Sequence, residues 1–193
     1  MRLTYSPGAT PLDPNEIEGL IPTSIATQGE LNDFEQRNIR EAEAWALKAN
    51  RPDALSDAFI RDLHRRMFNQ VWRWAGRYRT TDKNLGRPWP QVPESVRQLC
   101  EDAAFWIEHQ TYAWDELGAR VHHRLVSIHP FANGNGRHAR LLTDVLLQSH
   151  GVPLFTWGSE TMVETEKTRE AYLTALRAAD GQDLGPLMAF VRS

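Results

Sequence analysis

The stretch HPFANGNGRHAR, residues 129–140 of a 193-residue chain, carries the densest chemical information in this sequence. A residue that precedes proline avoids the α region, so His129 is expected to lie at the end of a helix. Gly134 and Gly136 surround Asn135, and glycines allow backbone turns and close approaches that other residues resist. The apolar-periodic run that follows predicts a new helix after Gly136.

The start of this second helix has the features of an anion site. The first N–H groups of a helix lack intrahelical partners and point toward negative charge. Arg137 and Arg140 are three residues apart and therefore share one face of the first turns, where forked guanidinium groups suit phosphate oxygens. His129, whose side chain titrates near neutrality, lies beside them. The residues alone predict a polyphosphate site with a base next to it.

Composition sets the outer limits. A chain of 193 residues fits one domain, and its formal net charge of −3 gives no general attraction to nucleic acid. The single cysteine, Cys100, excludes an internal disulfide framework and is typical of a reducing compartment. The chain starts without a signal-peptide pattern and has no apolar run near the roughly 20 residues of a membrane span. We expect a cytoplasmic protein without a membrane segment.

Helical spacing of apolar residues dominates the chain and predicts an all-α fold. We expect residues 1–30 to form an arm and residues 31–193 to form a single helical domain. Ser56 is an expected N-cap, and His150-Gly151 is an expected helix end. Residues 76–93, GRYRTTDKNLGRPWPQVP, lack helical spacing and are rich in turn formers. A short β-hairpin flap is the main prediction there, with an ordinary polar loop as the alternative.

The stretch 129–140 resembles the signature of the Fic family, HPFx(D/E)GN(G/K)RxxR. The run AGRYR at residues 75–79 and the run REAYLTAL at residues 169–176 are also similar to Fic domains, and the likeness covers roughly residues 31–191. Within the family, the chain most resembles the compact bacterial group called mobile mystery protein B. Eight of the nine defined signature positions match: His129, Pro130, Phe131, Gly134, Asn135, Gly136, Arg137 and Arg140.

This resemblance implies transfer of AMP from ATP to a Tyr, Ser or Thr hydroxyl of a target protein, with release of diphosphate. His129 would be the general base. A glycine at the (G/K) position matches the AMP-transferring majority of the family. The phosphates would be held by Gly134, Asn135, Gly136, Arg137 and Arg140, and the flap residues Arg79, Thr80 and Thr81 would dock the target by backbone pairing.

The chain departs from the signature at Asn133, where the family has an acidic magnesium ligand. A carboxamide oxygen can still ligate Mg²⁺ but lacks the charge of a carboxylate. We therefore expect weaker metal binding here. A nucleotide-binding module without catalysis remains an alternative because of this residue.

Many Fic proteins carry an inhibitory glutamate in an (S/T)xxxE(G/N) motif that pairs with the second signature arginine. The best match is PNEIEG at residues 14–19, which would place Glu18 opposite Arg140, although a proline stands in the Ser/Thr position. Glu30 and Glu35 are rival candidates, and a solvated arm without a regulatory role is equally compatible. The resemblance also leaves room for a small inhibitory partner encoded nearby, as in toxin–antitoxin pairs.

A different class of function is a nucleic-acid-associated regulator of a mobile element. It would use the flap cations Arg77, Arg79, Lys83 and Arg87. Four charges in an acidic chain, with little aromatic interleaving, make this alternative the weaker one.

Overall fold

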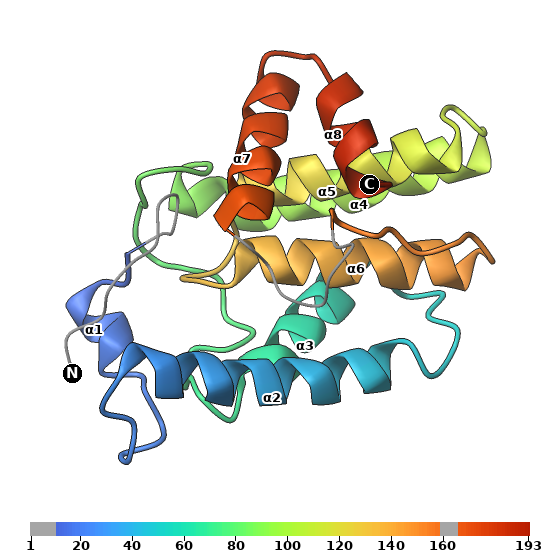
Figure 1. Cartoon of the computed structure of the whole chain (residues 1–193). Coiled ribbons are helices and arrows are strands. Elements are labelled where there is room, and N and C mark those ends of the chain that lie inside the picture. Colours follow the sequence, from blue (N-terminus) through green and yellow to red (C-terminus); the bar gives the residue numbers. More distant parts are fainter. Residues whose placement is uncertain (1–10, 159–165) are drawn as a thin grey trace.

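Two consecutive helices, joined by the signature loop, lie at the centre of the fold (Figure 1). They are α5 (Trp114–Ile128) and α6 (Asn135–Ser149), which pack along each other in a computed structural model. The structure describes residues 11–158 and 166–193. The loop between the two helices lies on the same side of the molecule as α1 and the green segment between α3 and α4 (Figure 1).

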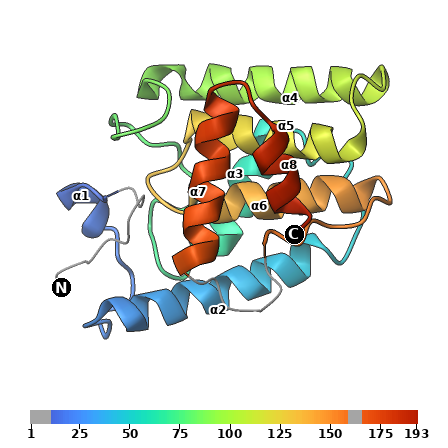
Figure 2. The same ribbon diagram turned by 45° about the horizontal axis from the view of Figure 1, so that its top comes forward.

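The other helices cover this central pair. On one side, α2 (Gln28–Ala46) packs on α3 (Asp57–Phe68), which contacts α6. On the other side, α4 (Val92–Glu108) packs on α5, and α7 (Glu166–Asp180) and α8 (Gly185–Val191) pack on each other, with α8 also on α5. Figure 2 shows α7 and α8 crossing over the central pair. The all-α prediction is confirmed, and α2 begins three residues before the expected start of the domain.

Local signals place most helix ends as predicted. Ser56 caps α3 by accepting a hydrogen bond from the Phe59 backbone N–H at 3.1 Å. Helix α5 stops at Ile128 because His129 adopts a left-handed conformation, with φ 55° and ψ 61°. Helix α6 stops at Ser149, followed by His150 as C-cap and by Gly151 with φ 70°.

The predicted β-hairpin at residues 76–93 is wrong. Residues 77–88 form an irregular loop without strands, and the remainder forms the 3₁₀ turn η1 (Trp89–Gln91) and the start of α4. Two backbone N–H groups of the loop donate to the end of α5 and the signature segment. Arg79 donates to the Pro130 carbonyl at 3.0 Å, and Arg87 donates to the Ile128 carbonyl at 3.2 Å. Because the signature segment takes these donors, the two limbs do not pair with each other. We call residues 77–88 the flap loop.

The N-terminal segment braces the flap loop. Helix α1 (Pro14–Ile17) presents two carboxylates to Lys83, whose ammonium lies 2.9 Å from Asp13 and 2.6 Å from Glu16. The Lys83 side chain is only 3% exposed and that of Glu16 is 15% exposed, so this pair is shielded from solvent, whereas Asp13 remains partly exposed. Thr81 also donates a hydrogen bond to Asp13 at 2.7 Å. Residues 13–16 therefore hold the loop that passes the signature segment.

A half-buried carboxylate holds the segment that follows α6. Asp144 accepts hydrogen bonds from the Trp157 indole N–H at 2.9 Å and from the Phe155 backbone N–H at 3.3 Å. Burial nevertheless raises the pKa of Asp144 to about 7, because the charged form loses more solvation than these two donors return.

Within residues 11–158 and 166–193, no helix is both long enough and apolar enough to cross a membrane.

The raised pKa of Asp144 predicts a pH-dependent stability. The folded state holds the Asp144 proton up to about pH 7, whereas the ordinary carboxyl value is 3.8, so this residue's contribution is lost as the pH rises between these values. The histidines buried as neutral rings, such as His138 with a pKa lowered to about 4 by burial, act in the opposite direction.

The difference between wild type and Asp144→Asn isolates the carboxyl from these histidines. Urea unfolding between pH 4 and pH 7 should show wild type losing stability relative to the variant as the pH rises. A difference that stays constant across this range would contradict the assignment.

Candidate active site

His129 lies at the point where α5 ends, with only 7% of its surface exposed. Burial, and next the positive charge of Arg79, lower the pKa of His129 to about 4. The imidazole is therefore neutral at pH 7, which is the form that can accept a proton. Negative ligand charge near it would raise this pKa and make it a stronger base.

The flap loop holds the turn at His129 through one buried guanidinium. Arg79 is 4% exposed, and its Nε donates to the His129 carbonyl at 2.7 Å. Its other nitrogens donate to the carbonyl of Arg87 and, at 2.9 Å, to that of Thr81. The Arg79 side chain is thus turned inward and joins both limbs of the loop to the end of α5, while the docking of a target by backbone pairing stays a prediction. Thr80 and Thr81 are exposed, as docking requires, although Thr81 also bonds Asp13.

Gly86 lets the flap loop cross closely over His129. Its φ of +103° is a conformation that side chains rarely adopt. A Cβ added there would lie 2.7 Å from the His129 Cβ and 2.9 Å from an Arg79 Nη2 atom. The loop therefore covers the candidate base at a distance that only glycine permits.

Asn135 closes the signature loop on itself. Its side-chain oxygen accepts from the Phe131 backbone N–H at 2.9 Å, and its amide nitrogen donates to the Phe131 carbonyl at 2.8 Å. Asn135 is 3% exposed. Its amide was predicted to contact phosphate, but in this geometry it shapes the loop instead. Gly134, with φ 77°, packs so closely on Phe68 that a Cβ would lie 2.5 Å from the ring.

His64 supports the same loop and was not predicted from the sequence. Its Nδ1 accepts from the Gly76 N–H at 3.0 Å, so the other nitrogen carries the proton and donates to the Asn133 carbonyl at 3.0 Å. The ring also stacks on Phe131, with centroids 3.7 Å apart. A histidine on the apolar face of a predicted helix was the available signal, because buried polar groups need partners.

His138, inside the signature, faces the core rather than phosphate or solvent. It is fully buried, and its Nε2 lies 2.9 Å from the Ile60 carbonyl.

The first signature arginine is held by helix α2. Arg137 donates to Glu35 at 2.7 Å, and the other Glu35 oxygen accepts from the Trp72 indole N–H at 2.7 Å. Glu35 is 6% exposed, whereas the Arg137 side chain is 32% exposed. A buried carboxylate thus orients a guanidinium that remains accessible at the start of α6.

The second signature arginine is held on the opposite side by aromatic rings. The Arg140 guanidinium lies 4.3 Å from the ring centroid of Tyr172 on α7 and 5.9 Å from that of Trp157. The Tyr172 hydroxyl lies 2.9 Å from Nε2 of the buried His122. The same hydroxyl would be 3.5 Å from a Cβ at Gly136, so this ring borders the start of α6.

Of the three acidic candidates for inhibition, only Glu35 touches a signature arginine, and that arginine is Arg137. Glu18 is exposed at the end of α1, and its backbone carbonyl accepts a weak bond from Arg73 at 3.4 Å. No ion pair between Glu18 and Arg140 is present in the described part of the chain. Glu30 forms the capping box of α2, where it accepts from the Thr27 backbone N–H at 2.9 Å.

Asn133, the residue predicted to contact a metal, has an engaged side-chain oxygen. Its Oδ1 accepts from the Gly134 N–H at 2.7 Å and lies 3.5 Å from an Arg137 nitrogen. An amide oxygen has two lone pairs, so a bond to a hard cation would have to replace the longer contact, the one with Arg137. Among the described residues, no group of three or more His, Cys, Asp or Glu could hold a metal ion.

Together these residues form a neutral imidazole next to a helix N-terminus that two arginines flank. The loop of residues 129–134 joins the base to the anion site, and it is held by contacts from Arg79 and His64, which are distant in the sequence. Such an arrangement can bind a chain of phosphates and accept a proton from a nucleophile that attacks one of them.

Comparisons with known proteins agree with this site. Residues 54–147, which include the whole signature, match the Fic/DOC family. The chain is 34% identical over 150 residues to "Protein adenylyltransferase fic-1" of Caenorhabditis elegans, which is 76% of this chain and 28% of that protein. Over 69 residues it is 45% identical to "Uridine 5'-monophosphate transferase" of Xanthomonas campestris pv. campestris (strain 8004), which is 32% of this chain and 13% of that protein.

The solved structure of BepC from Bartonella tribocorum, which contains bound AMPPNP, has the same fold. It aligns with a TM-score of 0.72 at 18% identity and covers 92% of this chain and 95% of that one. The chain spans about a quarter of the length of the first curated relatives, 28% and 25%. The fold, the signature loop and the match over residues 54–147 together place this chain in the Fic/DOC family.

Proposed function

We propose that this chain transfers AMP from ATP to a hydroxyl side chain of a target protein and releases diphosphate. The observation that carries the proposal is the neutral, buried His129 at the end of α5, facing an α6 N-terminus flanked by Arg137 and Arg140. The names of the adenylyltransferase relatives support the same reaction.

In this reaction the target hydroxyl oxygen attacks the α-phosphorus, and the bond from that phosphorus to the bridging oxygen of diphosphate breaks. His129 takes the hydroxyl proton, which its neutral ring allows. The backbone N–H groups at the start of α6, with Arg137 and Arg140, stabilise the charge that moves onto the departing diphosphate. The products are the AMP-modified side chain and diphosphate, and the reaction needs no further reactant.

We propose magnesium as the cofactor, bound together with the nucleotide. Asn133 would supply one protein oxygen, and the phosphates and water would supply the others. The ion would act as a Lewis acid on the phosphates.

The cellular setting follows the same resemblance. We propose a cytoplasmic protein, because its one cysteine, Cys100, is a free and buried thiol.

We also propose a small inhibitory partner, as in toxin–antitoxin pairs, since Glu18 is not placed to inhibit. A role in nucleic-acid binding is disfavoured because Arg79 and Lys83, two of the four flap cations, are buried in internal contacts.

The reaction predicts that label is transferred from α-labelled ATP but not from γ-labelled ATP. Incubation of the protein with each form and with a cell lysate, followed by electrophoresis, measures this. His129→Ala should reduce the transfer by roughly 10²- to 10⁴-fold, the usual contribution of a general base. Parallel reactions with α-labelled UTP test the chemistry that the Xanthomonas relative's name describes.

Transfer of the γ label alone would instead indicate phosphorylation. ATP binding without any labelled protein would favour the nucleotide-binding module, with catalysis lost at Asn133.

The amide at position 133 predicts a weak magnesium requirement that a carboxylate would strengthen. Asn133→Asp should lower the magnesium concentration that gives half-maximal transfer, because it adds a negative charge beside the bound phosphates. Asn133→Ala is the matched control and should raise that concentration or abolish the transfer. Equal magnesium dependence of wild type and Asn133→Asp would show that this side chain does not contact the metal.

The pair of Glu35 and Arg137 predicts that Glu35 positions the arginine rather than inhibiting the enzyme. Loss of the buried carboxylate should free Arg137 to swing away, so Glu35→Gln should lower the rate of transfer by about tenfold or more. Glu18→Gly should leave it unchanged, because Glu18 is exposed and lies outside the site. A rise in activity for either variant would identify that residue as inhibitory.

A further inference from the structure

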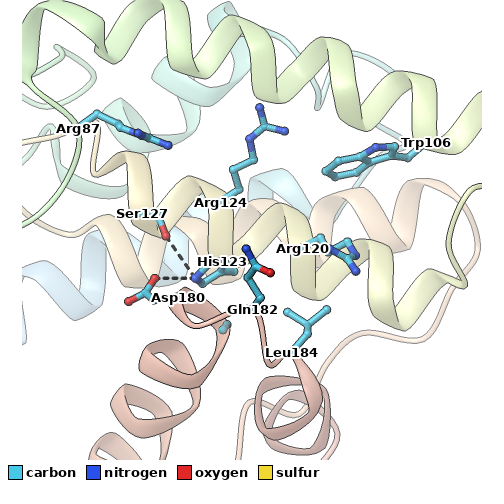
Figure 3. Close-up of a pocket in the computed structure, with 10 residues that line it drawn as sticks. Arg87, Trp106, Arg120, His123, Arg124, Ser127, Asp180, Gln182 and Leu184 are labelled. Carbon is cyan, nitrogen blue, oxygen red and sulfur yellow. Dashed lines mark hydrogen bonds and ion pairs between the residues drawn. The ribbon is translucent and has the colours of Figure 1, made fainter.

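A second concave site lies beside the flap loop, away from the signature arginines. It is a pocket of about 670 Å³ between α4, α5 and the turn that joins α7 to α8 (Figure 3). Its walls carry three arginines and one aspartate, namely Arg87, Arg120, Arg124 and Asp180, together with Trp106 and His123.

Two of these arginines are held in place by acidic partners, but each keeps N–H groups that can donate to a ligand. Arg120 bonds Glu116 through Nε and Nη2, and Arg124 bonds Asp102 through Nη1. A guanidinium carries five N–H donors, so Nη1 of Arg120 and Nε and Nη2 of Arg124 are not used in these pairs. Arg87 comes from the flap loop, and its side chain has no ion pair with any residue that the structure describes.

The same pocket contains Ser127, His123 and Asp180, but they do not form a hydrolytic triad. Asp180 and Ser127 both contact the same ring nitrogen of His123, at 2.8 Å and 3.4 Å (Figure 3). A relay needs the acid and the nucleophile on opposite nitrogens. Ser127 therefore has no proton relay here, and the charged side chains of the pocket are suited to binding instead.

The flap loop runs from the proposed base to this pocket. Gly86 faces His129, and its neighbour Arg87 enters the pocket. Leu85 and Trp89, on either side of Arg87, are 39% and 42% exposed, which is unusual for large apolar side chains. A chain segment lying across the flap loop at His129 would thus meet an apolar edge and then the arginines.

We propose that this pocket binds acidic side chains of the target protein, in the segment next to the modified hydroxyl. The proposal rests on the function proposed above. Arg124 and Arg120 precede His129 by five and nine residues on α5, roughly 7 and 13 Å at 1.5 Å per residue. An extended peptide advances about 3.3 Å per residue, so the acids should lie about two to four residues from the hydroxyl.

The surrounding acids favour a short carboxylate over a nucleic acid. Asp180 in the wall, with Glu116 and Asp102 behind the arginines, would repel a continuous row of phosphates. A single carboxylate needs only one forked guanidinium to bind it. The partly exposed pairs Arg120–Glu116 and Arg124–Asp102 are weak, so each arginine can also bind a second carboxylate.

The test measures how tightly the wild-type protein binds three fluorescein-labelled nonapeptides, each with a central threonine. Fluorescence anisotropy gives the dissociation constant of each peptide. One carries glutamates two and four residues before the threonine, one carries them after it, and the third carries glutamines at all four positions. We expect one glutamate peptide to bind at least about fivefold more tightly than the glutamine peptide, and this difference to shrink at high salt. Equal dissociation constants for all three peptides with the wild-type protein would overturn the proposal.

Variants then locate the site. Arg87→Gln combined with Arg124→Gln should remove the preference for glutamate. Arg97→Gln is the matched control, because Arg97 is also an exposed arginine paired with glutamates, on the outer face of α4. Loss of the preference in Arg97→Gln to the same extent would indicate diffuse charge rather than this pocket. Stronger competition by a DNA oligonucleotide than by poly-glutamate would also overturn the proposal in favour of nucleic acid.

A labelling arm separates this inference from the proposed function. The same peptides are incubated with α-labelled ATP and magnesium. Labelling of all peptides at equal rates would refute the pocket but keep AMP transfer. A binding preference without any labelling of peptides or lysate proteins would keep the pocket but refute AMP transfer.

Discussion

The guanidinium of Arg79 occupies the end of α5, where a helix leaves its last carbonyl groups without intrahelical donors. These carbonyls also form the negative end of the helix dipole, which a buried cation compensates. Arg79 donates to the carbonyl of His129 at 2.7 Å and reaches that of Ile128 at 3.5 Å. It also holds both limbs of the flap loop, so the position of the candidate base and the path of the loop depend on one side chain.

Two helix ends of opposite polarity meet at the signature loop. The end of α5 is neutralised by Arg79, whereas the start of α6 is left to attract anions. Asn135 and His64 keep the short connection between them rigid. The base therefore lies near a positive site but is kept uncharged by burial and by the same arginine, which is the state a proton acceptor requires.

The sequence predicted those features whose causes are local. Helix periodicity, the Ser56 cap and the stop at His129-Pro130 depend on neighbouring residues, and the structure agrees with each. The partners of the site residues depend on the fold instead. Glu35 meets Arg137 across 102 positions, and His64 meets Asn133 across 69.

The wrong prediction of a hairpin also arises from contacts between residues that are distant in the sequence. The flap was predicted as a hairpin because its composition favours turns, but the end of α5 competes for its backbone donors. The inward position of the Arg79 side chain had no local signal either, because the carbonyls it satisfies come from a helix 50 residues away. A polar residue on an apolar helical stripe, such as Glu35 or His64, is the sequence signal that pointed to such distant partners.

The brace formed by Asp13, Glu16 and Lys83 has a consequence for the thermodynamics of recognition. A loop without regular structure normally loses conformational entropy when a partner orders it, and that loss weakens binding. Here the loop is already tied to the start of α1 by two ion pairs of the buried Lys83 ammonium before any partner arrives. The entropy is lost when the chain folds, so the N-terminal segment, remote from the phosphates, contributes to affinity for a partner that it need not touch.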